Sequence, residues 1–318
     1  MTLWVRRALS IFSKSSTRLP YPKTRSWLWL QIVVALTLWA SAFPAIRVAL
    51  RDYSPTHIAL ARYLVASLTM AILLIGQRFS LPQRADWWRV FVAGFFGFAL
   101  YNVALNTGEV HVPAGTASFL VNTAPIWTLL ILTFSGREKI AARGWFGVIV
   151  SLCGVAIIAL SRRDENGELW RADPQFLASA SYILLAAFGT SFYVLQQKTL
   201  LQRYQPLQLT AWAIWAGTIC LLPFGGGLWN ELRDAPAGAT WSLIYMGVFP
   251  GAFAYALWTR VLVTLDISRA VSFIYLIPIL ATAISWFWLH ETLSTWAFLG
   301  GFLALGGVIL VNTAKKTL

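Results

Sequence analysis

Charged residues are scarce in this sequence. Only 12% of its 318 residues are Asp, Glu, Lys or Arg, about half the share of about 25% that a soluble globular protein carries. This deficit excludes a soluble domain, and the hydrophobic share of 58% excludes a disordered chain. Two cysteines are too few for a disulfide-rich secreted scaffold. The class that remains is a membrane protein with many spanning segments.

Motifs of catalysis and cofactor binding are missing as well. The sequence has no P-loop, HExxH or GxSxG pattern, and Cys153 and Cys220 lie inside apolar runs without metal-ligand spacing. We therefore expect no enzymatic activity, no metal and no cofactor; an intramembrane enzyme or a non-transporting scaffold stays a remote alternative. The net charge of +13 is spread between apolar runs, so we expect the lipid bilayer and not nucleic acid as partner.

The apolar runs are long enough to cross a bilayer. A hydrocarbon core about 30 Å thick needs about 20 residues in helix. Ten windows of the sequence reach that length, with connections of about a dozen residues at most, which predicts an all-α integral membrane protein. These windows lie near residues 27–50, 55–76, 87–108, 113–134, 143–161, 174–196, 206–225, 239–262, 268–288 and 295–313.

Lys and Arg are distributed unequally between the two sides of this predicted bundle. With a cytoplasmic N-terminus, eighteen of the 25 lie on the inner side and five in outer loops, while Arg47 and Arg62 lie inside helices. The positive-inside rule therefore predicts that both termini are cytoplasmic. Residues 1–26 are rich in Arg, Lys and Ser, and no acid precedes Asp52, which favours a basic cytoplasmic arm; an organellar targeting segment is the alternative.

An internal repeat divides the chain into halves. A shift of 153 residues aligns positions 88–155 with later positions without a gap, and it pairs Trp88 with Trp241, Pro125 with Pro278, and Glu138 with Glu291. Because each half has five helices, an odd number, the second half must enter the membrane from the opposite side. Inverted repeats are typical of secondary transporters, which alternate access around a site between the halves. The predicted divisions are the arm 1–26, the first repeat 27–161 and the second repeat 174–313.

The repeated residues resemble the EamA repeat of the drug/metabolite transporter superfamily. The resemblance rests on Ala114–Pro125, Gly136-Arg137-Glu138, Gly147 and Gly154 in the first half, and on Tyr255–Trp258, Ser268-Arg269-Ala270, Ile277-Pro278, His290-Glu291, Gly300 and Gly307 in the second. Trp39, Phe43-Pro44 and Ala61-Arg62-Tyr63 fit the opening segments of the family. Arg137 and His290 depart from it by replacing a common Gly. The resemblance implies a ten-helix carrier of the bacterial inner membrane without nucleotide hydrolysis, whose relatives mostly export amino acids, related metabolites or small drugs.

Arg62 is the most informative charged residue. It lies about seven residues inside its helix, or about 10 Å along the axis at 1.5 Å per residue. A charge at that depth is a functional candidate, and Glu109, backbone carbonyls or a substrate carboxylate are its possible partners. Arg47 lies only about one turn from its helix end, so we expect its side chain to extend to the interface.

Three glutamates, Glu109, Glu138 and Glu291, are gate or coupling candidates. For Glu138 and Glu291, positions at helix ends favour a simpler role, binding backbone N–H groups at the start of the following helix. No acid lies at the centre of a predicted helix. This absence favours facilitated diffusion, or coupling through Glu138, Glu291 or the charge of the substrate.

A polar and aromatic lining is expected near mid-span. With Arg62, the substrate-binding candidates are Trp39, Ser41, Tyr101, Asn102, Asn122, Tyr182, Ser191, Tyr255, Trp258 and Tyr275. Helix–helix packing is the alternative role for each of them. The glycines at 147, 154, 300 and 307 are expected to permit close helix packing. The sequence thus favours export of a small organic metabolite, such as an amino acid, by alternating access; transport of a drug, sugar phosphate or nucleotide sugar is the alternative.

Overall fold

The computed structural model describes residues 25–77, 79–136, 139, 141–160, 173–265 and 272–313. Within this part of the chain, ten helical segments are long and apolar enough to cross a membrane. The prediction of an all-α membrane protein with ten spans is confirmed. The predicted arm, residues 1–26, lies outside the described residues except for the two at its end.

Each half of the chain supplies five spans. The first half contains α2 (Arg25–Ala49), α3 (Pro55–Leu74), α4 (Trp87–Gly94), a π-helical turn (Phe95–Leu100), α5 (Tyr101–Gly108), α6 (Ala114–Val121), α7 (Ala124–Phe134) and α8 (Ala142–Leu160). The second half contains α9 (Pro174–Leu200), α10 (Pro206–Leu221), α11 (Leu228–Asp234), α12 (Ala237–Val248), a π-helical turn (Phe249–Phe253), α13 (Ala254–Thr264), α15 (Ile277–Leu289) and α16 (Thr295–Thr313). Short 3₁₀ turns cover Arg84–Asp86 and Leu222–Gly225.

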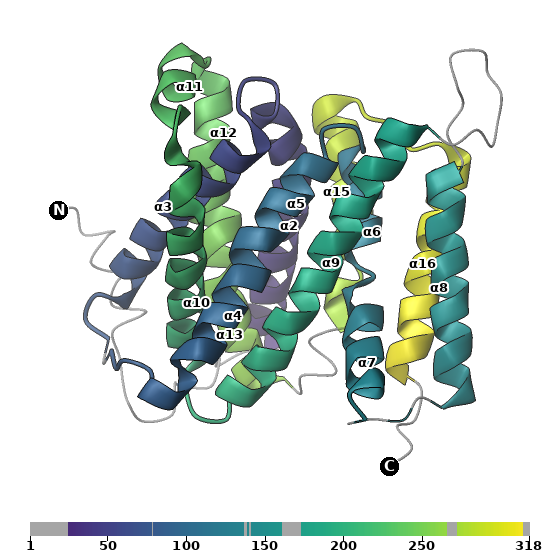
Figure 1. Ribbon diagram of the computed structural model, residues 1–318, viewed down its shortest axis with the longest axis horizontal. Coiled ribbons are helices and arrows are strands. Elements are labelled where there is room, and N and C mark those ends of the chain that lie inside the picture. Colours follow the sequence, from purple (N-terminus) through teal and green to yellow (C-terminus); the bar gives the residue numbers. More distant parts are fainter. Residues whose placement is uncertain are drawn as a thin grey trace.

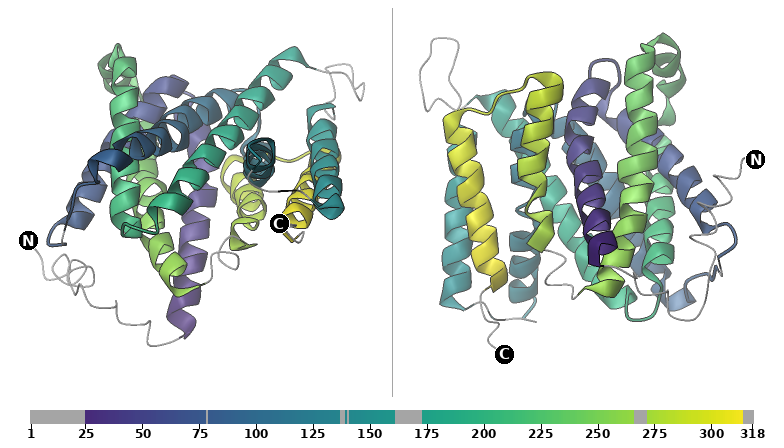
Figure 2. Two further views of the ribbon diagram at one scale, coloured as in Figure 1. Left: turned by 60° about the horizontal axis from the view of Figure 1, so that its bottom comes forward. Right: turned by 180° about the vertical axis from the view of Figure 1, so that it is seen from behind.

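The spans run back and forth between two faces of the molecule. The first turn of α2 and the last turn of α16 lie at the same face, at the bottom of Figure 1 and of the right view of Figure 2. We call it the terminal face. The opposite face carries the connections 50–54, 109–113 and 290–294, and we call it the Arg47 face after a residue in the last turn of α2.

The middle of the bundle is built by helices from both halves. α2 packs against α12, α13 and α15, α3 packs against α10 and α12, and α5 packs against α9. Prolines begin α3, α9 and α10, where a missing N–H removes no helical hydrogen bond and the fixed φ suits the first turn. These contacts bring residues from the two repeats together near mid-span.

Glycines let α8 and α16 approach each other closely at one edge of the bundle (Figure 1). A Cβ atom placed on Gly154 would lie 2.5 Å from the carbonyl oxygen of Gly300, and one on Gly307 would lie 2.5 Å from that of Gly147. Both distances are far below a van der Waals contact, so only glycine fits at this helix spacing. The expectation that these four glycines permit close packing is confirmed.

Irregular backbone recurs at matching places in the two halves. The π-helical turns of the third and eighth spans overlap when the chain is shifted by the repeat length of 153 residues. The fourth and ninth spans are interrupted by turns at Asn122-Thr123 and Tyr275-Leu276, again one repeat apart. Pro125 and Pro278 lie in the first turn of the helix that follows each interruption, where the missing N–H and the ring of proline disfavour continuation of the preceding helix.

Candidate functional site

Seven buried or half-buried residues from four spans form a group near mid-span, which we call the central cluster. Its members are Trp39, Arg62, Tyr63, Phe98, Asn102, Tyr255 and Trp258. Five of them, Trp39, Arg62, Asn102, Tyr255 and Trp258, are among the predicted substrate-binding residues. The cluster therefore collects candidates from α2, α3, α5 and α13 in one place.

Arg62 is the charged member of the central cluster and is only 5% exposed. Its Nη1 donates a hydrogen bond of 3.1 Å to Oδ1 of Asn102, and its guanidinium carbon lies 5.5 Å from the centre of the Tyr63 ring. Its Nε is buried and has no hydrogen-bond partner. Among the described residues, no carboxylate lies within 4 Å of the guanidinium, so the predicted alternative of an ion pair with Glu109 is not formed.

Asn102 is held in place by the backbone of its own span. Its Nδ2 donates a 2.8 Å hydrogen bond to the carbonyl oxygen of Phe98, which belongs to the π-helical turn just before α5. The amide oxygen is thereby directed toward Arg62. A π-helical turn inserts one extra residue into a helix and is frequent at functional sites; Tyr255 likewise follows the second such turn.

Aromatic rings form the rest of the central cluster. The ring of Trp39 meets that of Tyr255 at 5.2 Å and that of Trp258 at 5.3 Å, both edge to face. Phe98 continues the group, 5.6 Å from Tyr255 and 5.5 Å from Tyr63. The indole N–H of Trp39 is buried without a hydrogen-bond partner. The cluster thus joins one cation, two unpaired N–H donors and several π faces.

The remaining predicted lining residues lie outside these contacts. Ser41 shares a 2.6 Å hydrogen bond with Tyr245, and Ser191 donates to the carbonyl oxygen of Ala124. Asn122 bonds to a carbonyl of its own helix, and the hydroxyl of Tyr275 bonds to the amide of Asn312. Tyr101 is half-buried beside Asn102, whereas Tyr182 is 45% exposed on α9.

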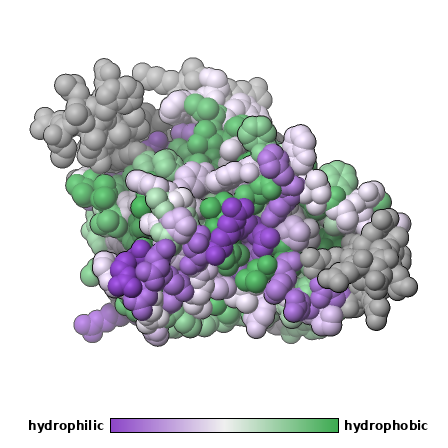
Figure 3. Space-filling model, turned by 90° about the horizontal axis from the view of Figure 1, so that it is seen from above, coloured by the Kyte–Doolittle hydropathy of each residue, from purple (hydrophilic) through white to green (hydrophobic). Residues whose placement is uncertain are grey.

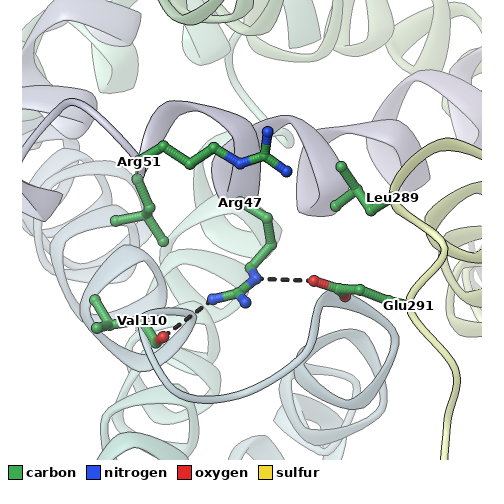
Figure 4. Close-up of a pocket in the computed structure, with 6 residues that line it drawn as sticks. Arg47, Arg51, Val110, Leu289 and Glu291 are labelled. Atoms are coloured by element: carbon green, nitrogen blue, oxygen red, sulfur yellow. Dashed lines mark hydrogen bonds and ion pairs between the residues drawn. The ribbon is translucent and has the colours of Figure 1, made fainter.

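Arg47 joins the two halves at the face named after it (Figure 4). Its Nε donates to Oε1 of Glu291 at 3.0 Å, and its Nη1 donates to the carbonyl oxygens of Glu109 and of Val110, the latter at 3.0 Å. The second carboxylate oxygen of Glu291 accepts a 3.0 Å hydrogen bond from the backbone N–H of Ala114. We call this set of bonds the Arg47 closure.

One expectation about the Arg47 closure was wrong, that for Glu291. The side chain of Arg47 is 30% exposed, in keeping with its expected reach to the interface, and it also pairs with a carboxylate from the other half of the chain. Glu291 does bind a backbone N–H at a helix start, but at α6 and not at the following helix, α16. No local sequence signal marks either contact, because the partners are 244 and 177 residues apart. Glu138, the repeat counterpart of Glu291, lies outside the described residues.

The Arg47 closure surrounds a pocket of about 170 Å³ at the surface, lined by Arg47, Leu50, Arg51, Val110, Leu289 and Glu291 (Figure 4). Seen from this side, hydrophilic side chains gather across the middle of the face (Figure 3). Glu109, which precedes Val110 of the pocket lining, is fully buried, and neither oxygen of its carboxyl group has a hydrogen-bond partner among the described residues. Burial raises the pKa of this carboxyl well above its usual range, although the charge of Arg47 opposes the shift.

Comparison with known proteins agrees with this architecture. Residues 26–160 and 177–313 each match the EamA-like transporter family. The chain belongs to this family. Two EamA domains of about the same size account for the two halves of the fold, and they make the protein a membrane transporter of the drug/metabolite transporter superfamily and not an enzyme.

Bacterial relatives of this EamA protein match nearly its whole length. An uncharacterized transporter, YdfC, of Bacillus subtilis (strain 168) is 36% identical over 283 residues, covering 88% of this chain and 90% of the relative. A protein of Streptantibioticus cattleyicolor named as a "probable terminal-alkyne amino-acid exporter" is 34% identical over 291 residues, covering 92% and 94%. A crystal structure at 16% identity superposes with a TM-score of 0.59 over 90% of this chain and 96% of that one, which shows the shared fold.

Proposed function

We propose that this EamA protein exports an amino acid or a related small metabolite across the bacterial inner membrane by alternating access. The two five-helix halves would rock around the central cluster, which would bind the substrate. A drug, a sugar phosphate or a nucleotide sugar is the alternative cargo. Phosphorylated cargo would call for several cations at the site, and Arg62 is the single Lys or Arg in the central cluster.

One observation carries this proposal: Arg62 is a buried cation that has no carboxylate partner among the described residues. A buried charge is costly unless an opposite charge or several hydrogen bonds compensate it. Here one neutral amide and one aromatic face compensate it in part, and Nε remains unpaired. A substrate carboxylate supplies both the missing charge and the acceptor, and guanidinium and carboxylate match in geometry.

The aromatic members of the central cluster suit the rest of an amino acid. A protonated amine is attracted to the π faces of Trp and Tyr, and an apolar side chain packs against the same rings. The unpaired indole N–H of Trp39 offers a further donor to a carboxylate or carbonyl oxygen. The relative from S. cattleyicolor, which is 34% identical and is named a "probable terminal-alkyne amino-acid exporter", supports the same substrate class.

Charge distribution supports an orientation with both termini in the cytoplasm. Eighteen of the 25 Lys and Arg residues then lie on the inner side, and the Arg47 face is the outer one. We propose the predicted divisions for the same polypeptide: a basic cytoplasmic arm over 1–26, one repeat over 27–161 and the other over 174–313. Export then requires the Arg47 closure to open outward while the terminal face closes.

Efflux from proteoliposomes tests the proposal. Vesicles containing the purified protein are loaded with a mixture of amino acids and related metabolites, and the solutes released are quantified by mass spectrometry. We expect selective efflux of carboxylate-bearing solutes. Replacing Arg62→Ala should lower that efflux at least about tenfold, because a hydrogen-bonded charge contributes about 1.5–3 kcal/mol, and Arg62→Lys should restore part of it.

Arg233→Ala is the matched control, since this arginine is exposed on α11 and, among the described residues, pairs only with its neighbour Asp234. It should leave efflux unchanged. Efflux of Arg62→Ala at the rate of the parent protein would contradict the proposed carboxylate contact. Absence of selective efflux by the parent protein would contradict the export proposal itself.

A further inference from the structure

We propose that Glu109 is a proton-binding site that controls the Arg47 closure: the closure forms when Glu109 carries a proton and opens when Glu109 ionises. The inference deepens the transport function proposed above and rests on it for its physiological meaning. It begins from the geometry of one side chain, which is fully buried and whose two oxygens have no hydrogen-bond partner in the part of the chain that the structure describes.

The position of Glu109 is unfavourable for a negative charge. The residue is the C-cap of α5, where the partial negative charge of the helix dipole repels a carboxylate. Its neighbour Gly108 is pressed against Ile183 of α9, where an added Cβ would lie 2.3 Å from that side chain. This tight packing excludes the water that would otherwise solvate the carboxylate.

The arginine that could neutralise Glu109 is already engaged. Arg47 gives its Nε to the carboxylate of Glu291 and its Nη1 to the backbone carbonyls of Glu109 and Val110. A second nearby cation, Arg62, donates to the neutral amide of Asn102 and forms no ion pair with Glu109. With Glu109 neutral, Arg47 and Glu291 form a balanced pair; with Glu109 ionised, two carboxylates would compete for the guanidinium of Arg47.

Among the described residues, no cation of α3, α6 or α9 forms an ion pair with Glu109. His57 of α3 pairs with Glu231, α6 contains no ionisable residue, and α9 brings only Tyr182 and uncharged residues to this end of the bundle. The charges of Arg47, Arg62, Tyr101 and Glu291 act on Glu109. Arg51 lines the surface pocket together with Arg47 and Glu291. His111 follows Glu109 by two residues, His290 precedes Glu291, and Tyr182 adjoins Ile183, which packs against Gly108.

An ionised Glu109 would weaken the closure in two ways. Its carboxylate would attract Arg47 away from Glu291, and its need for hydration would favour admission of water between α5 and α6. Both effects separate the ends of the helices that the Arg47 closure holds together. Protonation removes the charge and restores the closed arrangement.

The sign of the pH dependence follows from linkage. Burial raises the pKa of Glu109 in the closed form, whereas in a water-filled open form the pKa returns toward about 4.3. Closure is therefore fully stabilised below the open-form pKa, and this stabilisation is lost as the pH rises through the raised closed-form pKa. Between the two values, the ratio of open to closed molecules rises up to about tenfold per pH unit.

Distance measurements between spin labels test the proposal without any substrate. Cysteines replace Asn230 on α11 and Thr292 after α15, two exposed positions on the Arg47 face, in full-length protein carrying Cys153→Ser and Cys220→Ser. α11 and the end of α15 lie well apart across this face (Figure 1). Double electron–electron resonance in lipid nanodiscs from pH 5 to pH 9 should show a population at longer distance that grows with pH.

Two variants identify the titrating group. Glu109→Gln, which mimics the protonated side chain, should remain at the short distance over the whole pH range. Asp52→Asn, an exposed acid on the same face, should titrate like the parent. A Glu109→Gln protein that opens with pH as the parent does would overturn the proposal. So would a parent protein whose distances do not change between pH 5 and pH 9, a result that needs no variant to fold.

This experiment separates the proton site from the export proposal. A pH-dependent closure that Glu109→Gln abolishes supports the proton site even if the efflux assay finds no amino acid. Selective efflux by a protein whose label-to-label distances do not change with pH would refute the proton site and leave the export proposal intact.

Discussion

The close contact between α8 and α16 predicts that one added methyl group lowers the stability of the protein. Gly307 faces α8, and a Cβ atom there would lie 2.5 Å from the carbonyl oxygen of Gly147 and 2.5 Å from the backbone nitrogen of Ser151. Both obstacles are backbone atoms of a regular helix, so neither can rotate away. Gly307→Ala must therefore push the two helices apart by about 1 Å, because ordinary contacts between such atoms begin near 3.5 Å.

The cost of that displacement is estimated from two opposing effects. Overpacking a well-fitted contact costs about 1–3 kcal/mol. Replacing glycine by alanine inside a helix raises the free energy of unfolding by about 0.5–1 kcal/mol, because the unfolded chain loses conformational freedom. The two effects together predict that Gly307→Ala lowers the free energy of unfolding, by up to about 2.5 kcal/mol.

The adjacent glycine is a matched control. An added Cβ on Gly306 meets nothing within 4 Å, so Gly306→Ala should keep or raise stability by up to about 1 kcal/mol. Unfolding of both variants and the parent in mixed micelles, followed by circular dichroism as the denaturing detergent is increased, measures the difference. Equal stability of Gly306→Ala and Gly307→Ala would refute the close packing of α8 on α16.

Two further predictions concern the Arg47 face. Arg47→Gln and Glu291→Gln, made singly and together, should show a coupling of about 0.5–1 kcal/mol in the free energy of unfolding. The coupling is modest because the two side chains are 30% and 20% exposed, so water screens their charges in part. Losses of the single variants that simply add in the double variant would contradict the ion pair. In a cysteine-free background, Thr292→Cys should react with a membrane-impermeant maleimide added to intact cells, and labelling only after permeabilisation would reverse the proposed orientation.

The sequence was sufficient to predict the spans and their repetition. In lipid every backbone N–H and C=O must be satisfied within the protein, so a run of about 20 apolar residues has few options other than a helix. The repeat was visible because Gly, Pro and Trp pairs recur at a fixed shift of 153 residues. The glycine contacts of α8 with α16 could be anticipated for the same reason.

The side-chain contacts of the site could be predicted only in part. Trp39, Arg62 and Asn102 were chosen because polar and aromatic residues are unusual near mid-span, and the fold brings them together. The ion pair of Arg47 with Glu291 was missed. A cation one turn from a helix end can reach either water or an acid, and its position in the sequence does not show which. Glu291 was assigned the right kind of partner at the wrong helix, since the first turn of every helix offers free N–H groups.

Helix interruptions were also missed, although a signal for them was present. Pro125 and Pro278 occupy equivalent positions of the repeat, each three residues after the start of a turn that breaks its span. Two prolines at matching depth in two apolar runs indicate discontinuous helices, which frame the binding sites of many transporters. Asn122 and Tyr275 were selected for their polarity, yet their shared position at the break is the more informative property.

The two halves resemble each other more in backbone geometry than in the polar residues of the site. Both have a π-helical turn in the third span, a break in the fourth and paired glycines in the fifth. Arg62 has no such counterpart, because α10, the matching helix of the second half, contains no Lys or Arg, and Asn102 corresponds to Tyr255 under the repeat shift. Alternating access requires each half to adopt the conformation of the other, which constrains backbone irregularities in both. On the export proposal, a single bound carboxylate would require only one guanidinium, which would leave the polar residues of the site free to diverge.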